Sequence, residues 1–331
     1  MRPMRVHVEA WDPRYGANAD GGDSAGPEAA SSEEVDPAAE LPPESWQPLA
    51  PPPGLRAPDV VLLVDGVRRI DAHMWVEESD TSLQPCLAAS YAAGVVRCDL
   101  RRGAAEVASA RIVRGLFTPS PLLEDLTTTA AQYVVKRVGV RDPGKLANQV
   151  MPHLRALEVD VSRAQRAEAT SEDDLLVVDG PLEDRGALPR AIGYVKTHRR
   201  TYLPPQLATV ITRIKPGQRT PYFSVGTRWR QYSWYLRLPG PVGSPWAGIV
   251  RVECSAELSR PEVTHLADLS AVTLPRLAST SYKDPRAPQN LVPIAGLEKR
   301  LRAMLGNAQL LHRALQSAVA AGNRAAPSDT L

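Results

Sequence analysis

Two short apolar segments end in the same pair of residues, and they constrain the fold of this chain more than any other feature. Residues 59–66 and 174–180 each carry a run of Val and Leu into an Asp-Gly pair, Asp65-Gly66 and Asp179-Gly180. Such a run is typical of a buried central strand. Side by side in a sheet, the two strands would present two carboxylates at one edge, which suits Mg²⁺ or Mn²⁺. Asp-Gly also commonly begins a turn, and for two matched copies the two interpretations stand about equal.

The remaining patterns predict a mixed α/β domain, because strands come first and helices then alternate with strands. We expect an antiparallel meander to follow the first apolar strand. The expected strands lie at 69–76, 87–100, 107–116, 191–196, 231–238 and 248–254. The expected helices lie at 122–138, 148–169, 260–277, 293–305 and 308–321.

Residues 1–57 differ in composition from the rest of the chain. They hold ten of the 31 prolines, ten acidic residues and four basic ones, which leaves a charge of about +8 for the remainder. Low hydrophobicity and scattered proline predict a disordered acidic tail, with one possible short strand at 5–11. We expect the folded domain over 58–320 and a disordered end at 321–331. An acidic tail on a basic body is a weak indication of nucleic-acid binding.

Composition excludes several classes of protein. The 331 residues are 43% hydrophobic, enough for a substantial core, so a wholly disordered chain is excluded. The longest apolar runs are too short to cross a bilayer, and we expect neither a signal peptide nor membrane association. Three cysteines without C-x-x-C spacing exclude a cysteine zinc cluster and indicate a reducing cytoplasm. No Walker motif is present.

Glu158 and Lys196 are further candidates for a catalytic site. Glu158 shares a helical stripe with Leu154 and Val161, so it needs a partner, a cation or a wet cleft. A salt bridge to Arg155 or Arg163 would satisfy it equally well. Three acids around one or two metal ions suit phosphodiester hydrolysis. Lys196 follows a predicted strand and could contact a phosphate, although a lysine in that place is more often only at the surface.

Residues 185–237 contain eleven Lys and Arg residues, no Asp or Glu, and eight of the 17 aromatic residues. Cations for the backbone and flat rings for the bases are what binding of single-stranded nucleic acid requires. The alternative is that some rings face the core by strand alternation. We favour nucleic-acid binding, through the side chains Lys196, His198, Arg199, Arg200, Tyr202, Arg228, Trp229 and Arg230.

The order of these segments resembles the NurA family of DNA-repair nucleases, over roughly residues 58–315. The first set of similar segments is Asp65-Gly66, Leu154-Arg-Ala-Leu-Glu158, Asp179-Gly-Pro-Leu182 and Gly193-Tyr-Val-Lys196. The segments similar to bacterial members are Arg219-Thr-Pro-Tyr-Phe223, Ser233-Trp-Tyr-Leu-Arg-Leu238, Gly248-Ile-Val-Arg-Val-Glu253 and Pro288-Gln-Asn-Leu-Val-Pro-Ile-Ala-Gly-Leu-Glu298.

This resemblance implies an RNase H-like fold and a Mn²⁺-dependent deoxyribonuclease, with Mg²⁺ as the other candidate ion and two ions expected. It implies a homodimer that docks on a HerA-type hexameric translocase and resects single- and double-stranded DNA ends for recombination. By the same resemblance Asp65, Glu158 and Asp179 match the acidic metal ligands and Lys196 the lysine after the third strand. The family usually ends its site with His or Asp on a C-terminal helix, where this chain offers Glu298.

Two alternatives remain from the sequence. One is a non-catalytic adaptor that binds DNA or the translocase. The other is a nuclease that acts on RNA, because the acidic residues do not discriminate between DNA and RNA.

Overall fold

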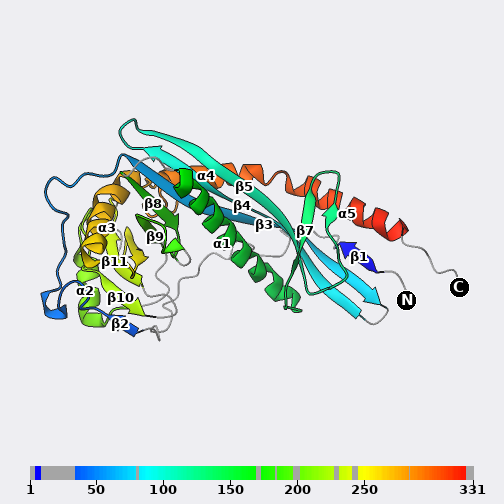
Figure 1. Ribbon diagram of the computed structural model, residues 1–331, viewed down its shortest axis with the longest axis horizontal. Coiled ribbons are helices and arrows are strands. Elements are labelled where there is room, and N and C mark those ends of the chain that lie inside the picture. Colours follow the sequence, from blue (N-terminus) through cyan, green and yellow to red (C-terminus); the bar gives the residue numbers. More distant parts are fainter. Residues whose placement is uncertain are drawn as a thin grey trace.

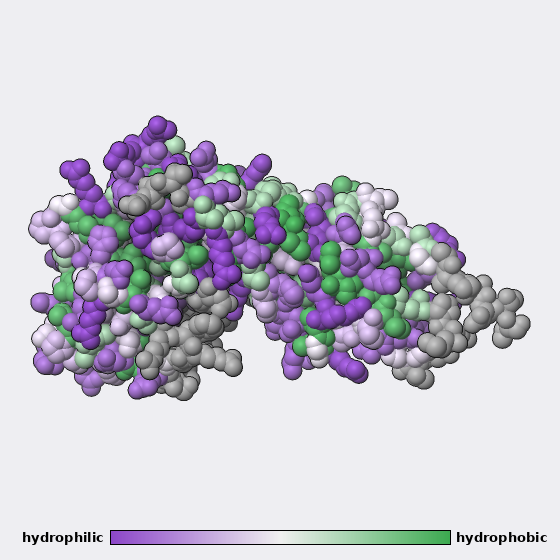
Figure 2. Space-filling view, viewed as in Figure 1, coloured by the Kyte–Doolittle hydropathy of each residue, from purple (hydrophilic) through white to green (hydrophobic). Residues whose placement is uncertain are grey.

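The computed structural model describes residues 4–8, 34–79, 82–168, 173–182, 185–196, 202–226, 231–240, 245–282 and 284–325. The molecule is elongated, with a broad lobe at one end and a narrower arm at the other (Figure 1). Figure 2 shows hydrophilic side chains over much of this face, with apolar patches on both parts. The two longest strands run through both parts and join them.

Twelve strands among the described residues form one mixed sheet. They are β1 Arg5–Val8, β2 Glu34–Asp36, β3 Val60–Ser79, β4 Ser82–Asp99, β5 Ala104–Thr118, β6 Leu126–Thr127, β7 Gln132–Arg137, β8 Asp174–Asp179, β9 Ala191–Val195, β10 Phe223–Gly226, β11 Gln231–Arg237 and β12 Ile249–Ser255. The main helices are α1 Pro143–Glu168, α2 Pro205–Arg213, α3 Arg260–Thr273, α4 Val292–Met304 and α5 Ala308–Ala325.

The centre of this sheet has the strand order β5-β4-β3-β8-β9. The first three strands are an antiparallel meander, β8 is parallel to β3, and β9 is parallel to β8. Helix α1 makes the crossover that a parallel connection needs. This is the topology of an RNase H-like core, so the predicted fold class is confirmed.

Helices cover both faces of the central strands because the residues of β3 alternate between two apolar clusters. Val60, Leu62 and Val64 pack with α1, whereas Val61 and Leu63 pack with α3 and α4 on the opposite face. Apolar residues spaced three or four apart give α1 its buried stripe. Its buried apolar residues are Leu146, Val150, Leu154, Leu157, Val159 and Val161.

The first apolar strand does not end at Asp65-Gly66, so the turn interpretation is wrong for this pair. β3 continues through both residues to Ser79 and pairs with β4 along its length. The distal halves of β3 and β4 form the arm with β1, β5, β7 and α5, around a separate apolar cluster. The four strands predicted at 59–66, 69–76, 87–100 and 107–116 are therefore three longer ones, because the first two are parts of β3.

The helix predicted at 122–138 is also wrong. This segment forms β6 and β7, and β7 pairs in parallel with β5. β-branched Thr and Val favour strands, and the pairing with β5 outweighs the weak helical pattern. Tyr133 anchors the segment: it is fully buried, and its hydroxyl donates to Asp71 at 2.9 Å.

Much of the segment predicted as a disordered tail is folded. Residues 5–8 form β1, within the short strand predicted at 5–11, and β1 pairs with β3. Residues 34–36 form β2, which pairs with β10. Trp46 is buried in the cluster beneath α2. Glu40 binds Arg219 through both carboxylate oxygens, at 2.7 and 2.8 Å. Polar anchoring and one large ring hold residues 34–57 to the body despite their low hydrophobicity.

The other predicted elements are present with shifted ends. Helix α1 begins at Pro143, five residues before the prediction, and α5 continues to Ala325. The helix predicted at 260–277 is α3 followed by a short 3₁₀ helix, Leu274–Leu277. None of the helices in the described ranges is long and apolar enough to span a membrane.

Candidate metal centre

Asp65 and Asp179 lie level on neighbouring parallel strands. The pairing of β3 with β8 aligns Val64 with Val178, so the next residue on each strand is an aspartate. β8 ends at Asp179, where Gly180 takes a positive φ of 110° and its N–H donates to the carbonyl of Tyr194 at 2.8 Å. A left-handed turn of this kind favours glycine, so the turn interpretation does describe the second Asp-Gly pair.

A third carboxylate, that of Glu298, joins them from helix α4. Ligand oxygens of Asp65, Asp179 and Glu298 all lie within 4.8 Å of one another. α4 can lie close to the sheet because β4 has a glycine beneath it. A Cβ on Gly94 would meet Leu297 and Leu301 side chains at 3.2 Å. The family resemblance alone had indicated Glu298, and the structure brings it to the two aspartates.

The Asp65 carboxylate is the least satisfied of the three. Its Oδ1 accepts from the Gly66 N–H at 2.7 Å, whereas its Oδ2 has no hydrogen-bond partner among the described residues. The residue is 8% exposed, and burial, followed by the nearby Asp179, raises the pKa of Asp65 well above its ordinary value. A buried carboxylate without a partner is costly. A divalent cation with oxygen ligands would satisfy it, so these residues fit a Mg²⁺ or Mn²⁺ ion.

Lys196 contacts Asp179 rather than standing free at the surface. Its Nζ donates to Asp179 Oδ2 at 2.6 Å and to Asn290 Oδ1 at 2.9 Å. Asn290 is fully buried and donates in turn to Asp284 at 2.5 Å. Burial raises the pKa of Asp179, and the Lys196 ammonium partly opposes this. The lysine is therefore fixed in place by a polar chain.

Glu298 is also paired. Both of its oxygens accept from Arg286, at 3.0 and 3.2 Å, and Arg286 lies in the segment between α3 and α4. This segment, 284–290, supplies both Arg286 and Asn290, neither of which sequence reasoning identified. Asn290 falls inside the stretch 288–298 that resembles the family, which was the only available signal.

Glu158 lies beside the three carboxylates but outside their group. It accepts from Arg185, in the segment after β8, at 2.5 Å. Its Oε1 lies against the backbone of Gly66, since a Cβ there would be only 2.5 Å away. Burial raises the pKa of Glu158, and Arg185 lowers it in opposition. The sequence predicted Arg155 or Arg163, on the same helix as Glu158, as its partner. The bonded partner is instead Arg185, although Arg155 also attracts the Glu158 carboxylate.

Buried charges support the turn that follows Asp179. Glu253 on β12 accepts from the Leu182 N–H at 2.6 Å and from Arg251 at 2.6 Å. Gly193 leaves room for this contact, because a Cβ would meet Leu182 N at 2.7 Å and Glu253 Cγ at 2.8 Å. These residues fix the path of the chain at the site, and sequence reasoning did not identify them.

Much of the described part of the basic, aromatic stretch belongs to the core, although Arg213 and Lys215 are exposed and Tyr202 is half-buried. Tyr194, Tyr222, Phe223, Trp234 and Tyr235 are all buried. The Tyr202 ring stacks under the Arg251 guanidinium at 4.9 Å, and Arg219 is buried between Glu40 and Asp268. The nucleic-acid interpretation is wrong for these core rings and for Arg219. His198, Arg199, Arg200, Arg228, Trp229 and Arg230 lie outside the described residues.

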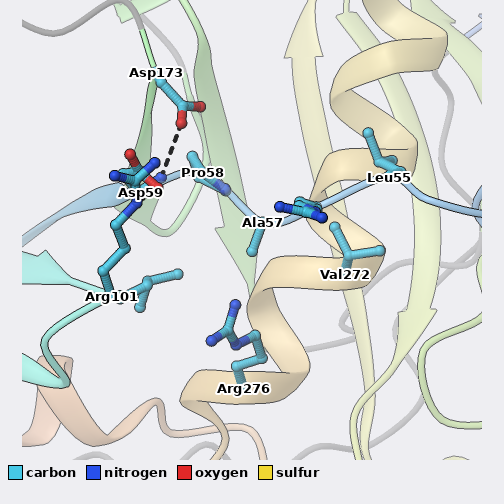
Figure 3. Close-up of a pocket in the computed structure, with 10 residues that line it drawn as sticks. Leu55, Ala57, Pro58, Asp59, Arg101, Asp173, Val272 and Arg276 are labelled. Carbon is cyan, nitrogen blue, oxygen red and sulfur yellow. Dashed lines mark hydrogen bonds and ion pairs between the residues drawn. The ribbon is translucent and has the colours of Figure 1, made fainter.

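A cleft of about 520 Å³ lies at the N-terminal ends of β3 and β8, away from the acidic cluster (Figure 3). The Asp59 N–H donates to Asp173 at 3.2 Å, and Arg101 bonds to Asp59 at 2.5 Å. The strands place this cleft about 20 Å from Asp65 and Asp179, at ~3.3 Å per residue. It is therefore separate from the candidate metal centre.

Comparison with solved structures finds nucleases of low similarity. The NurA nuclease from Sulfolobus solfataricus is 10% identical, with 86% of this chain and 90% of that chain covered and a TM-score of 0.47. Endonuclease V from Bacillus subtilis is 13% identical, with 74% and 80% covered and a TM-score of 0.32. A NurA structure bound to dAMP and manganese is 13% identical, with 44% and 24% covered and a TM-score of 0.21.

No protein-family model matches the chain, and no curated protein matches it either. Two of the three structures named above are NurA nucleases, the family that the sequence resembles. All three TM-scores are below 0.5, so these structures carry no argument about the function of this chain.

Proposed function

We propose that this protein is a metal-dependent nuclease whose ion is held by Asp65, Asp179 and Glu298. One observation carries the proposal: Asp65, whose buried Oδ2 has no hydrogen-bond partner among the described residues, forms with Asp179 and Glu298 a group of carboxylates that offer oxygens within 4.8 Å of one another. Three carboxylates on rigid elements, two strands and one helix, match the oxygen-rich sites that hard divalent ions prefer.

The bound ion would polarise a phosphodiester and activate water. The residues of the chain have separate tasks around it. Asp65, Asp179 and Glu298 hold the ion. Asn290 and Asp179 hold the Lys196 ammonium in place. When substrate binds, Lys196 would donate to a phosphate oxygen in place of one of its hydrogen bonds to Asp179. Glu158 and Arg185 form an ion pair beside Gly66 and complete the catalytic site.

The family resemblance of the sequence supports the finer assignments. We propose Mn²⁺ as the preferred ion and DNA ends, single- and double-stranded, as the substrate. The protein would act as a 5′–3′ exonuclease and single-strand endonuclease in double-strand break repair by homologous recombination. It would work as a cytoplasmic homodimer with a HerA-type translocase. His198, Arg199, Arg200, Tyr202 and the segment Arg228-Trp229-Arg230 would contact the strand.

The test uses a 5′-labelled single strand and a blunt duplex, each with Mn²⁺, Mg²⁺ or EDTA. Asp65→Ala should abolish cleavage and leave DNA binding intact or slightly tighter, because a negative charge near the phosphate is removed. Asp160→Ala is the matched control, since Asp160 is an exposed acid on α1. Full cleavage by Asp65→Ala would refute the site, and parallel RNA strands distinguish the two nucleic acids.

One observation favours the adaptor as a second candidate. Asp179 and Glu298 already have cationic partners, Lys196 and Arg286, so two of the three carboxylates are balanced without any ion. An adaptor would bind DNA with a steep dependence on salt and yield no product with any metal. Metal-stimulated cleavage that disappears in Asp65→Ala excludes it.

A further inference from the structure

The charges around the site balance all but one of its acids. Asp65, Glu158, Asp179 and Glu298 are the four carboxylates. Three cations each contact one of them at 3.0 Å or less: Lys196 on Asp179, Arg286 on Glu298 and Arg185 on Glu158. Asp65 has no cationic partner at that distance among the described residues. In the absence of an ion, these seven groups sum to about one net negative charge when all are ionised, and Arg155 near Glu158 and Asp284 beside Arg286 add one charge of each sign.

Arg185 is the cation with the most restricted position. Its side chain is 3% exposed and that of Glu158 is 12% exposed, with 2.5 Å between Nη2 and Oε2. Its other terminal nitrogen donates to the carbonyl of Pro181 at 3.3 Å, two residues after Asp179. The guanidinium is thus tied both to the helix that carries Glu158 and to the turn after β8.

Glu158 is the acid that a second ion would require. Its carboxylate lies against Gly66, next in sequence to Asp65, and it repels Asp179 electrostatically. Arg185 bonds to Oε2 of Glu158, while Oε1 lies against Gly66, so a second ion that bound both oxygens of Glu158 would have to displace the guanidinium. An ion and the guanidinium cannot both bind Oε2.

We propose that Arg185 takes the place of a second divalent ion, so that the site binds one ion, held by Asp65, Asp179 and Glu298. This inference rests on the proposed metal-dependent function and specifies how many ions the proposed site binds. One divalent ion changes the net charge of the group from about −1 to about +1. A second ion would raise it to about +3 in a buried site, where uncompensated charge is expensive. Arg185 supplies a permanent positive charge on the Glu158 side.

Arg185 therefore determines how many ions the site binds, in addition to its structural ion pair with Glu158. Replacing it with glutamine removes the cation that is bonded to Glu158 and opens room for an ion beside it. Replacing it with lysine keeps the charge. Glu158→Gln removes a carboxylate that, on this proposal, is not an ion ligand in the wild-type chain.

The experiment counts Mn²⁺ bound per full-length chain by equilibrium dialysis, with electron paramagnetic resonance to detect coupling between neighbouring ions. We expect one uncoupled ion for the wild type, Arg185→Lys and Glu158→Gln. We expect two for Arg185→Gln, and one again for the double variant Arg185→Gln, Glu158→Gln. Arg163→Gln, an exposed arginine on α1, is the matched control and should bind one.

Other outcomes separate this inference from the proposed function. Two coupled ions in the wild type, or one ion in folded Arg185→Gln, overturn the role of Arg185 while the metal site stands. No bound ion in the wild type refutes the proposed metal site itself. If circular dichroism shows that Arg185→Gln is unfolded, Glu158→Gln decides: an unchanged count of one supports the inference, and the loss of an ion overturns it.

Discussion

The Glu158 carboxylate lies directly over Gly66, so closely that a Cβ at this glycine would be 2.5 Å from Oε1 and 2.7 Å from Leu154 Cδ1. Glycine at this position lets α1 lie on β3 next to Asp65. The Asp65-Gly66 pair is thus a point of close helix–strand approach inside a continuous strand, and the glycine helps to set the distance between Glu158 and the aspartates.

Gly66→Ala should destabilise the protein and displace Glu158. Overpacking of a well-packed contact costs about 1–3 kcal/mol, and Arg185 restrains the side chain that would have to move. Urea unfolding measures the free-energy change. The control is Gly296→Ala in α4, where an added Cβ meets nothing within 4 Å and should stabilise the helix by up to about 1 kcal/mol. Equal effects of the two substitutions would contradict the close approach.

The sequence was sufficient to predict the two aspartates because two apolar runs of similar length pair in parallel, which brings the residues that follow them to the same level. It did not identify Arg286, Asn290 or Arg185, because these side chains come from irregular segments whose paths no periodicity encodes. The arm was missed for a related reason. Its strands continue through glycines and polar residues that resemble turns, and they are held by pairing with distant strands.

Asp65→Asn should stabilise the metal-free protein at neutral pH. Burial raises the pKa of Asp65, so between its ordinary value and the higher folded value the folded chain holds more protons than the unfolded chain. Stability therefore falls as pH rises through that window. The asparagine variant avoids this loss, so its free energy of unfolding should exceed that of the wild type by about 1–3 kcal/mol at pH 7. The difference between the two proteins should vanish below about pH 4. Urea unfolding in EDTA at both pH values tests this, and a variant less stable than the wild type at pH 7 would contradict it.

Mn²⁺ should stabilise the wild-type chain against heat, because an ion that binds only the folded state shifts the equilibrium toward it. At a hundredfold excess over the dissociation constant the gain is about 2.7 kcal/mol, which corresponds to a few degrees in Tm. Asp65→Asn should lose most of this shift, whereas the surface variant Asp160→Ala should keep it. Differential scanning fluorimetry with and without EDTA gives the measurement. A full shift in Asp65→Asn would mean that the ion binds elsewhere.

Glu40→Gln should unfold the chain at a lower urea concentration. Arg219 is 2% exposed, and Glu40 supplies two of its contacts and also accepts from the Tyr222 N–H at 2.7 Å. Breaking a buried pair costs about 3–5 kcal/mol. Because Asp268 still accepts from Arg219 at 2.7 Å, we expect the free energy of unfolding to fall by about 3 kcal/mol. The exposed Glu44→Gln should change stability by less than about 0.5 kcal/mol. Matching results for the two would show that residues 34–57 do not contribute to the fold.

The three cysteines should resist alkylation in the folded protein. All are buried, and burial raises the pKa of Cys98 to about 11 and that of Cys86 to about 12. Because the thiolate is the nucleophile, modification by iodoacetamide at pH 8 should be at least about two hundredfold slower than in the chain unfolded by guanidinium, where the pKa is near 8.5. Mass spectrometry of timed samples measures the rate for each cysteine. Rapid modification of Cys86 in the native protein would mean that the arm opens, because this residue lies in the apolar cluster that α5 covers.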